Sequence, residues 1–392
     1  MSDGALAGVR VLDLSRLLPG PMCTLYLADL GADVVKIEDT DAGDYARGLD
    51  APAGSTSAFY RAVNRGKRSV ALDLKQDEGR DAFMCLARGA NVMLESFRPG
   101  VVRALGVDYD AVARVNPAIV YCSLTGYGQE GPRAAMAGHD INYLGYAGVL
   151  DQTGVRGGPP ALCNVQVADL LGGAASAAIA ILAALVGASR SGRGRYIDVA
   201  MADASLAHNV FALHALEQRG TPPVRGADLL TGGVPCYGVY ATADARFVAV
   251  GALEHKFWSA LCNALGRPDL VEGRLARGDE GARVRDALQA VFVTATRDEW
   301  TARLAGVDCC VTPVLDIAEA MRDAQFSARE MVGRRSDGTR EIAPPFRMSG
   351  HAFAPDRSAP ALGAHTREVL LEAGLGEEAI ARLAARNVVR AG

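Results

Sequence analysis

The chain has 392 residues, enough for two domains, and a hydrophobic content of 49% that is typical of a globular protein with a large core. Its net charge of −4 and its scattered Lys and Arg residues argue against a nucleic-acid-binding surface. The eight cysteines form no C-x-x-C pair, which argues against a zinc site and favours buried, reduced thiols in a reducing compartment.

The first third of the chain alternates short apolar runs with segments of helical length. Such alternation predicts parallel strands joined by right-handed helical crossovers, an α/β fold of Rossmann type. The expected strands lie within 10–15, 32–38, 69–75, 90–96 and 118–124, and the expected helices within 22–31, 78–89 and 109–116.

Two stretches partly match nucleotide-binding motifs but lack residues that those motifs require. The first strand-to-helix turn reads LLPGPM, so Pro21 follows Gly20 where a G-x-G-x-x-G turn would approach a pyrophosphate. The stretch NRGKRS, residues 64–69, has Arg68 where a P-loop has Ser or Thr. The sequence therefore argues against NAD and against a P-loop, and leaves a basic turn at Lys67.

Residues 170–188 are uncharged over the length of a membrane span. Because nearly half of them are alanine, a buried core helix is the preferred interpretation. The first fifteen residues do not resemble a signal peptide. We therefore expect a cytoplasmic protein that is not inserted in a membrane.

The pattern of predicted secondary structure changes near residue 225. A predicted β-hairpin within 240–251 precedes amphipathic helices within 256–266 and 283–295, which indicates a smaller α+β domain. The expected organisation is a large domain over 1–200, a helical linker over 201–224, a small domain over 225–325, and a segment over 326–392 that returns to the large domain.

Three titratable residues stand at predicted element boundaries. His139 precedes a helix, Asp169 opens the alanine-rich helix, and Glu254 follows a strand. Each has a structural explanation: a packed histidine, a helix N-cap and a surface cap, with Asp140 expected to cap the helix of 141–150. A functional alternative is that Asp169 acts as a base or nucleophile beside the free N–H groups of its own helix. The residues alone lead only to an α/β enzyme with a possible acid/base pair, without a G-x-S-x-G elbow or metal-ligand spacing.

Six motifs together resemble family III CoA-transferases, in particular their α-methylacyl-CoA racemase branch. The resemblance runs from residue 8 to about residue 375. The motifs lie at 8–38, 64–75, 125–132 (TGYGQEGP), 137–143 (AGHDINY), 167–174 (VADLLGGA) and 310–315 (CVTPVL).

This resemblance implies a large Rossmann-like domain, a smaller domain and an interlocked homodimer with active sites between the large and small domains of different chains. In the transferase branch, the aspartate that matches Asp169 is the nucleophile of an anhydride mechanism. In the racemase branch, it is one of two bases beside the α-carbon of an acyl-CoA. His139 matches the other base, and Glu254 matches the glutamate that supports the histidine.

Inverting a stereocentre requires that a proton leave one face and that another arrive at the opposite face. Two bases can do this, each protonated when the other is not. The resemblance implies no metal, flavin or pyridoxal, and no cofactor beyond the CoA of the substrate. The implied partners are acyl-CoA or CoA and a second copy of the chain.

The motifs also carry over a CoA site. Its expected residues are Lys36, Leu72, Asp73, Lys75, Phe97, Arg98, Gly138, Asp140, Ile141, Asn142 and Tyr143. Three departures are visible: Asp39 stands where relatives often have a basic residue, Asn164 lies five rather than four positions before Asp169, and His255 replaces a frequent proline. We expect Lys36, Arg47 or Lys67 to take the place of the missing cation.

Three functions follow for testing. The favoured one is a racemase or epimerase of 2-methylacyl-CoA or other 2-substituted acyl-CoA thioesters. The second is a CoA-transferase that uses Asp169 as a nucleophile. The third is a non-catalytic acyl-CoA-binding module, which would need none of the three titratable residues.

Overall fold

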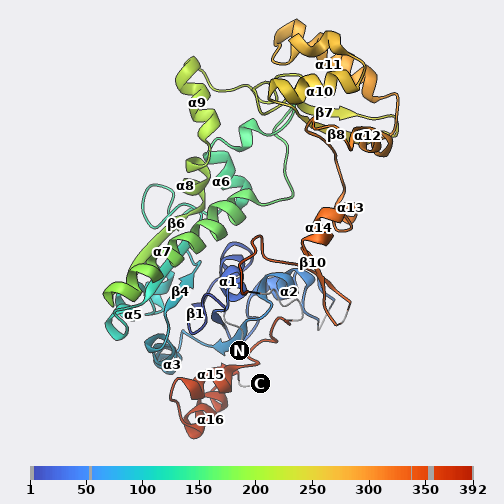
Figure 1. Ribbon diagram of the computed structural model, residues 1–392. Coiled ribbons are helices and arrows are strands. Elements are labelled where there is room, and N and C mark those ends of the chain that lie inside the picture. The colour runs from blue at the N-terminus through green and yellow to red at the C-terminus, as the bar shows by residue number, and fades with distance from the viewer. Residues whose placement is uncertain (1–3, 53–54, 337, 352–356, 391–392) are drawn as a thin grey trace. The chain divides into compact units, whose positions relative to one another are not determined.

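The computed structural model describes residues 4–52, 55–336, 338–351 and 357–390. The chain forms two compact units, which are joined by several crossings of the chain (Figure 1). Unit 1 comprises residues 1–147, 164–208 and 328–392, and unit 2 comprises residues 148–163 and 209–327. These boundaries differ from those expected from the sequence, mainly because residues 148–163 and 209–224 pack with unit 2.

Unit 1 is built on a seven-stranded sheet in the order β12-β3-β2-β1-β4-β5-β6. All pairs of neighbouring strands are parallel except the edge pair of β12 and β3. The five apolar runs predicted to be strands each overlap one of β1–β5, so the expected α/β fold with a parallel sheet is confirmed. The strands are β1 Arg10–Asp13, β2 Asp33–Glu38, β3 Arg68–Leu72, β4 Val92–Glu95, β5 Val120–Thr125, β6 Arg195–Ala200 and β12 Val389–Arg390.

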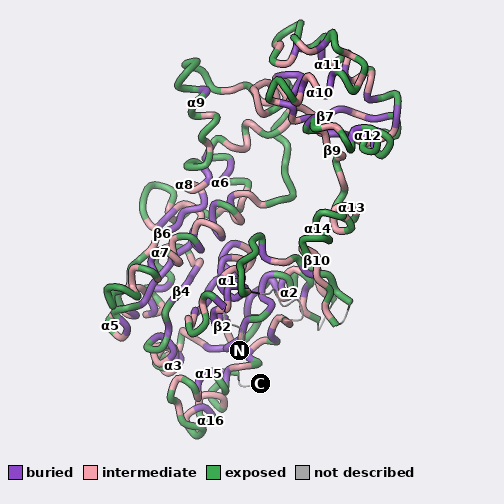
Figure 2. The backbone as a smooth tube through the Cα atoms, viewed as in Figure 1, coloured by how far each residue is buried: buried purple, intermediate pink, exposed green. Residues whose placement is uncertain are grey.

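Helices cover both faces of this sheet. Leu12, Val35 and Met93 belong to a hydrophobic cluster that also contains residues of α3 Asp77–Arg88, α5 Tyr109–Val115, α15 Thr366–Glu372 and α16 Glu377–Ala385. Side chains alternate along a strand, so the neighbours of these residues within each strand face the opposite side of the sheet. The helices α1 Pro19–Asp29 and α7 Ser176–Ser191 pack on that side. The inner strands are therefore buried on both faces (Figure 2).

The order of the strands creates a switch point between β1 and β4. The chain builds β2 and β3 on one side of β1 and then crosses to place β4 on the other side. Loops that follow β1 and β4 consequently separate above the carboxyl edge of the sheet, which is where open α/β sheets bind ligands. This edge carries the candidate site.

The alanine-rich segment forms one long helix, from the π-helical turn η3 Ala168–Ala175 into α7. It is the one helix in the described part of the chain that is long and apolar enough to cross a membrane by length and composition. The expectation of a buried core helix is only partly met, because fewer than half of its residues are buried. Leu171, Ile179 and Val186 leave a largely exposed apolar face.

Unit 2 has its own antiparallel sheet, in the order β7-β8-β9, and its own core around the fully buried Trp258. The predicted hairpin is present as β7 and β8. Its elements are η2 Leu150–Gln152, α9 Val210–Arg219, β7 Tyr237–Ala241, β8 Phe247–Gly251, α10 His255–Ala264, η4 Pro268–Gly273, α11 Gly278–Phe292, α12 Arg297–Leu304, β9 Val311–Pro313, α13 Ile317–Ala320 and, at the boundary with unit 1, α14 Ala324–Ala328.

The remaining elements belong to unit 1. They are η1 Tyr45–Gly48, α2 Ala58–Asn64, α4 Val101–Ala104, α6 Asp140–Tyr146, α8 Met201–Ala207, β10 Val332–Arg334 and β11 Arg340–Ile342. The expected linker over 201–224 thus contains two helices, α8 in unit 1 and α9 in unit 2.

Candidate active site

His139 is the N-cap residue of α6, as its predicted place before a helix requires. Its backbone is extended, with φ −130° and ψ 177°, and its N–H donates to Oδ1 of Asn142 over 3.0 Å. Its carbonyl accepts the N–H of Asn142 over 2.8 Å. Asn142, which was expected to contact CoA, therefore fixes the first turn of α6 and with it the exposed His139.

Asp169 lies in the first turn of η3, at the carboxyl edge of the sheet. Gly172 and Gly173 let this turn approach its neighbours closely. A Cβ on Gly173 would stand 3.1 Å from Pro19, the first residue of α1, and 3.1 Å from Met201, the first residue of α8. Because α1 follows β1 and α8 follows β6, these contacts place η3 across the ends of the strands. π-Helical turns of this kind are frequent at functional sites.

The expectation that Asp169 caps its helix is wrong. The helix begins at Ala168 after Val167, whose backbone is already helical, and Asp169 is the second residue of the first turn. Among the described residues, none donates a hydrogen bond to the Asp169 carboxylate. The Asp169 side chain therefore does not cap the helix, and it is only partly exposed to solvent.

Asp140 connects the two candidate bases. It was expected to cap α6, but it is the first residue of that helix, and its Oδ1 instead accepts the N–H of Asp169 over 3.0 Å. Burial, together with the charge of Asp140, raises the pKa of Asp169 from 3.8 to about 7. A carboxyl group with this pKa exchanges a proton readily near neutral pH.

The expected free N–H groups at the start of this helix are not free. The N–H of Asp169 is bound by Asp140, and the N–H of Leu170 donates to the carbonyl of Gln166 over 2.9 Å. These two groups therefore cannot stabilise an oxyanion while the turn keeps this structure. The oxyanion hole proposed there from the sequence is not supported at these positions.

Tyr143 braces α6 against the loop that follows β5. Its hydroxyl donates to the carbonyl of Gly138 over 2.6 Å, and its ring packs edge-on against Tyr127 with 5.1 Å between ring centroids. A Cβ on Gly126 would stand 2.3 Å from the Tyr143 ring, and one on Gly138 would stand 2.7 Å from it. Both glycines of these motifs are therefore explained by the ring that lies beside them.

The charge of Asp169 also acts on this tyrosine. Burial raises the pKa of Tyr143 to about 12, and the negative charge of Asp169 adds to the rise, while Arg98 opposes it. Tyr143 therefore stays protonated at neutral pH. The charges of Asp169 and Arg98, two predicted site residues, therefore both act on Tyr143, which is a third.

Arg16 was not predicted as a site residue, yet it lies at the switch point. It follows β1, and its guanidinium carbon lies 5.3 Å from the ring centroid of Phe97, which follows β4. Arg16 is more than a third exposed and forms a 3.4 Å surface ion pair with Asp39. Its place directly after the first strand was the signal in the sequence that could have identified it.

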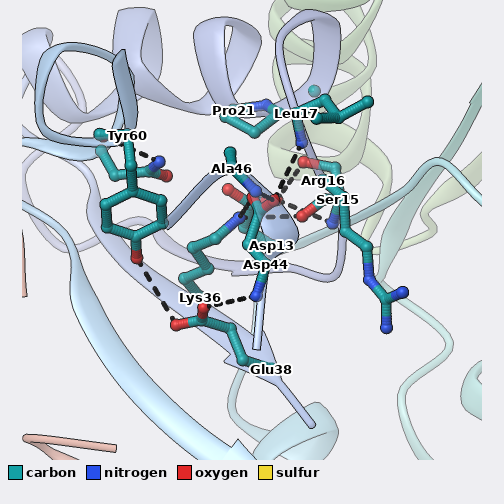
Figure 3. A network of polar contacts seen from close by, with 12 residues as sticks. Asp13, Ser15, Arg16, Leu17, Pro21, Lys36, Glu38, Asp44, Ala46 and Tyr60 are labelled. Atoms are coloured by element: carbon teal, nitrogen blue, oxygen red, sulfur yellow. Dashed lines mark hydrogen bonds and ion pairs between the residues drawn. The ribbon is translucent and has the colours of Figure 1, made fainter. Parts of the chain in front are cut away.

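A buried polar network fixes the loop that carries Arg16 (Figure 3). Nζ of Lys36 donates to the carbonyl of Ser15 over 2.8 Å and pairs with Asp44 over 3.1 Å. The Asp44 carboxylate in turn accepts the N–H of Leu17 over 3.2 Å, and Leu17 has a left-handed backbone with φ of 61°. Figure 3 shows the Arg16 side chain pointing away from this network.

This network overturns the expectation that Lys36, Lys67 or Arg47 binds the CoA nucleotide. The side chains of Lys36 and Lys67 are fully buried, and Arg47 pairs with the buried Glu38 over 2.6 Å. Nζ of Lys67 donates to Asp13 and to two further oxygens, so all three of its protons are used. In buried ion pairs such as these, each cation compensates a carboxylate and has no charge left for a phosphate.

The residues expected from the third strand have mixed placements. The side chain of Leu72 is buried in the main hydrophobic cluster, so it cannot line a surface site. Asp73 organises the turn that follows, because its carboxylate accepts the N–H of Lys75 and the side-chain amide of Gln76, each over 3.0 Å. Lys75, Arg98 and Ile141 are exposed.

Glu254 is the N-cap residue of α10 and is exposed, in agreement with its predicted place between a strand and a helix. It belongs to unit 2, whereas His139 and Asp169 belong to unit 1. Support of His139 by Glu254 therefore stays a prediction.

The chemistry available in unit 1 is proton transfer or nucleophilic attack by a partly buried carboxyl group, with an imidazole at the start of the adjoining helix. Within the described residues, no group of three or more His, Cys, Asp or Glu side chains is placed to hold a metal ion. The described cysteines form no disulfide bond, and five of them are buried.

Comparison with known proteins identifies the family. The model of CoA-transferase family III matches residues 6–366. The alpha-methylacyl-CoA racemase of Homo sapiens is 34% identical over 387 residues, which cover 98% of this chain and 97% of the relative. The acetyl-CoA:oxalate CoA-transferase of Acetobacter aceti is also 34% identical, over 89% of this chain and 90% of the relative.

A solved structure supports the same assignment. The crystal structure of a CAIB/BAIF family protein from Brucella suis superposes with a TM-score of 0.82 at 30% identity, over 95% of this chain and 100% of that chain. The fold, the motif residues and both comparisons agree: the chain belongs to CoA-transferase family III.

Proposed function

We propose that the protein is a racemase or epimerase that inverts the α-carbon of 2-methylacyl-CoA or other 2-substituted acyl-CoA thioesters. The observation that carries the proposal is the hydrogen bond that links Asp169, with its pKa of about 7, to the first residue of the helix capped by His139. This bond joins the turn that carries the Asp169 carboxyl group to the helix that begins directly after His139.

The reaction uses these groups as two bases. In one direction, Asp169 removes the α-proton, the electron pair moves into the thioester carbonyl to give an enolate, and the His139 imidazolium returns a proton to the opposite face. In the other direction, the roles exchange. A base whose pKa is near 7 serves both directions, because its protonated and ionised forms are both populated at neutral pH.

For the CoA moiety, we propose that exposed cations of unit 1 bind the phosphates. Arg98, Arg16 and Lys75 replace the buried Lys36 in this role, because their side chains reach solvent at the carboxyl edge of the sheet. Arginine suits phosphate through its fixed fork of donors. No further cofactor is part of the proposal.

We also propose that the active form is a cytoplasmic homodimer. The long helix η3–α7 exposes Leu171, Ile179 and Val186, and α9 of unit 2 exposes Val210 and Phe211. A second copy of the chain would bury apolar side chains of this kind, which a monomer would leave in water. The molar mass in solution, measured by light scattering, tests this directly: the value of one chain would contradict it.

The second candidate is a CoA-transferase with Asp169 as the nucleophile. The similarity to the acetyl-CoA:oxalate CoA-transferase favours it, as does the absence of a hydrogen-bond donor on the Asp169 carboxylate within the described structure. In that reaction the carboxylate attacks the thioester, CoA leaves as a thiolate and an aspartyl anhydride remains. His139 has no necessary part in these steps.

Exchange in heavy water tests the proposal against this alternative. A racemase incorporates deuterium at the α-position of a 2-methylacyl-CoA without an acceptor acid, and Asp169→Asn and His139→Ala each abolish racemisation. A transferase leaves the α-position unlabelled and forms an acyl-aspartate that hydroxylamine traps at residue 169, visible by mass spectrometry. Trapping without exchange, over a panel of acyl chains, would overturn the racemase assignment.

A further inference from the structure

Asp140 is neither of the two proposed bases. Its carboxylate contacts Asp169, and Asp140 directly follows His139 in the sequence. We propose that Asp140 is a positioning residue that ties the His139 end of α6 to the Asp169 turn of η3 and places a negative charge beside Asp169. This inference rests on the proposed function, since it assigns the geometry and protonation of the two bases to a third side chain.

The geometric part of the inference rests on a long-range hydrogen bond. Oδ1 of Asp140 accepts the N–H of Asp169 over 3.0 Å, across 29 positions of the chain. Because α6 begins at Asp140, this single bond joins the starts of the two elements. If it were lost, the backbone on either side could separate, and a misplacement of about 1 Å at reacting groups costs about 100-fold in rate.

The electrostatic part rests on the charge of Asp140. Two carboxylates that lie close together cannot both ionise freely, so the charge of one favours the protonated form of the other. Burial makes the larger contribution to the raised pKa of Asp169, and Asp140 is the charged group that adds to it. The N–H that Asp140 accepts comes from the backbone, and no Lys or Arg of the described residues forms an ion pair with Asp140.

Other titratable groups lie on the elements that pack against η3. They are His139, Tyr143 and Tyr146 on or before α6, Asp203 on α8, Cys23, Tyr26 and Asp29 on α1, Arg190 on α7, and Arg195, Tyr196 and Asp198 on β6. Of these, Tyr143 is coupled to the charge of Asp169, and it remains a neutral phenol. Asp29 is paired with Arg65 and Arg357. Asp140 is therefore the one charged group in the described structure that changes the titration of Asp169.

Three substitutions separate position from charge. Asp140→Asn keeps an oxygen that accepts the N–H and removes the charge. The part of the kcat–pH profile that follows ionisation of Asp169 should therefore move about one pH unit towards acid. The value of kcat at high pH should stay within about threefold of that of the unmodified protein. Asp140→Glu keeps the charge but displaces it, so this part of the profile should stay while kcat falls about 10- to 100-fold. Asp140→Ala should show both changes.

Asp203→Asn is the matched control, because it removes an exposed acidic charge from α8, which also packs against η3. It should leave the pH profile and kcat unchanged. An Asp140→Asn profile identical to that of the unmodified protein, or an Asp140→Ala variant with full kcat, would overturn the inference.

Titration by NMR gives a readout that does not depend on activity. Protein labelled with ¹³C at the aspartate carboxyl carbons shows one resonance that disappears in Asp169→Asn, and its midpoint should fall in Asp140→Asn but not in Asp203→Asn. An unchanged midpoint in Asp140→Asn refutes the electrostatic role. If the unmodified protein failed to exchange α-protons, the proposed function would fall, while this titration would still decide the part played by Asp140.

Discussion

Because its pKa is raised, ionised Asp169 lowers the free energy of unfolding at alkaline pH, and this loss can be measured without a substrate. Asp169→Asn removes the ionisation and keeps the shape of the side chain. A carboxyl group with a raised pKa in the folded protein contributes stability that is fully present below its unfolded value of 3.8 and is lost as the pH rises towards the folded value of about 7. The asparagine variant should therefore gain stability over the unmodified protein across this window.

The size of the gain follows from the two pKa values. They differ by about three pH units, and about 1.4 kcal/mol for each unit gives an upper limit of about 4 kcal/mol above pH 7. Because Asp169 is only partly buried, water screens the ionised form, and we expect about half of this. Unfolding in urea at about pH 4 and about pH 8, at one protein concentration, would give both free energies. An equal difference between variant and unmodified protein at the two pH values would refute a raised pKa at Asp169.

Two further predictions concern the groups that support the site. Lys67→Ala leaves Asp13 in a buried site with one cation fewer and should lower the free energy of unfolding by about 3–5 kcal/mol, whereas the exposed Lys75→Ala should change it by less than about 0.5 kcal/mol; similar urea midpoints for both would contradict the buried pair. Gly126→Ala places a Cβ 2.3 Å from the Tyr143 ring, so it should destabilise the protein by about 1–3 kcal/mol and lower kcat by displacing α6. Gly145→Ala on the same helix meets no atom within 4 Å and should be neutral or stabilising by up to about 1 kcal/mol; a kcat loss equal to that of Gly126→Ala would argue against the role of Tyr143.

The sequence was sufficient for the parts of the fold that local pattern determines. Apolar runs of strand length alternate with helical segments, and each run predicted as one of the first five strands overlaps one. The local places of His139 and Glu254, directly before helices, also follow from neighbouring residues. Pattern alone could not give unit boundaries, because residues 148–163 join unit 2 through contacts with residues distant in the chain.

The charged residues show where local reasoning fails. Lys36 lies within a predicted strand, and the resemblance to the family, together with Asp39 in place of a basic residue, led to its prediction as a CoA-binding cation. Its partners Ser15 and Asp44 come from other elements, and only the folded structure shows that they bury and neutralise it. The bond between Asp140 and Asp169 is hidden for the same reason, since it joins residues 29 positions apart. Asp140 consequently looked like an ordinary helix cap.

The most direct test of the two-base account is α-deuterium exchange by the single-base variants, followed separately for each enantiomer of a 2-methylacyl-CoA. If Asp169 and His139 serve opposite faces, His139→Ala should still label the enantiomer whose proton Asp169 removes, without inverting it. Asp169→Asn should label only the other enantiomer. Labelling of both enantiomers by either variant, or continued racemisation by one of them, would contradict the account.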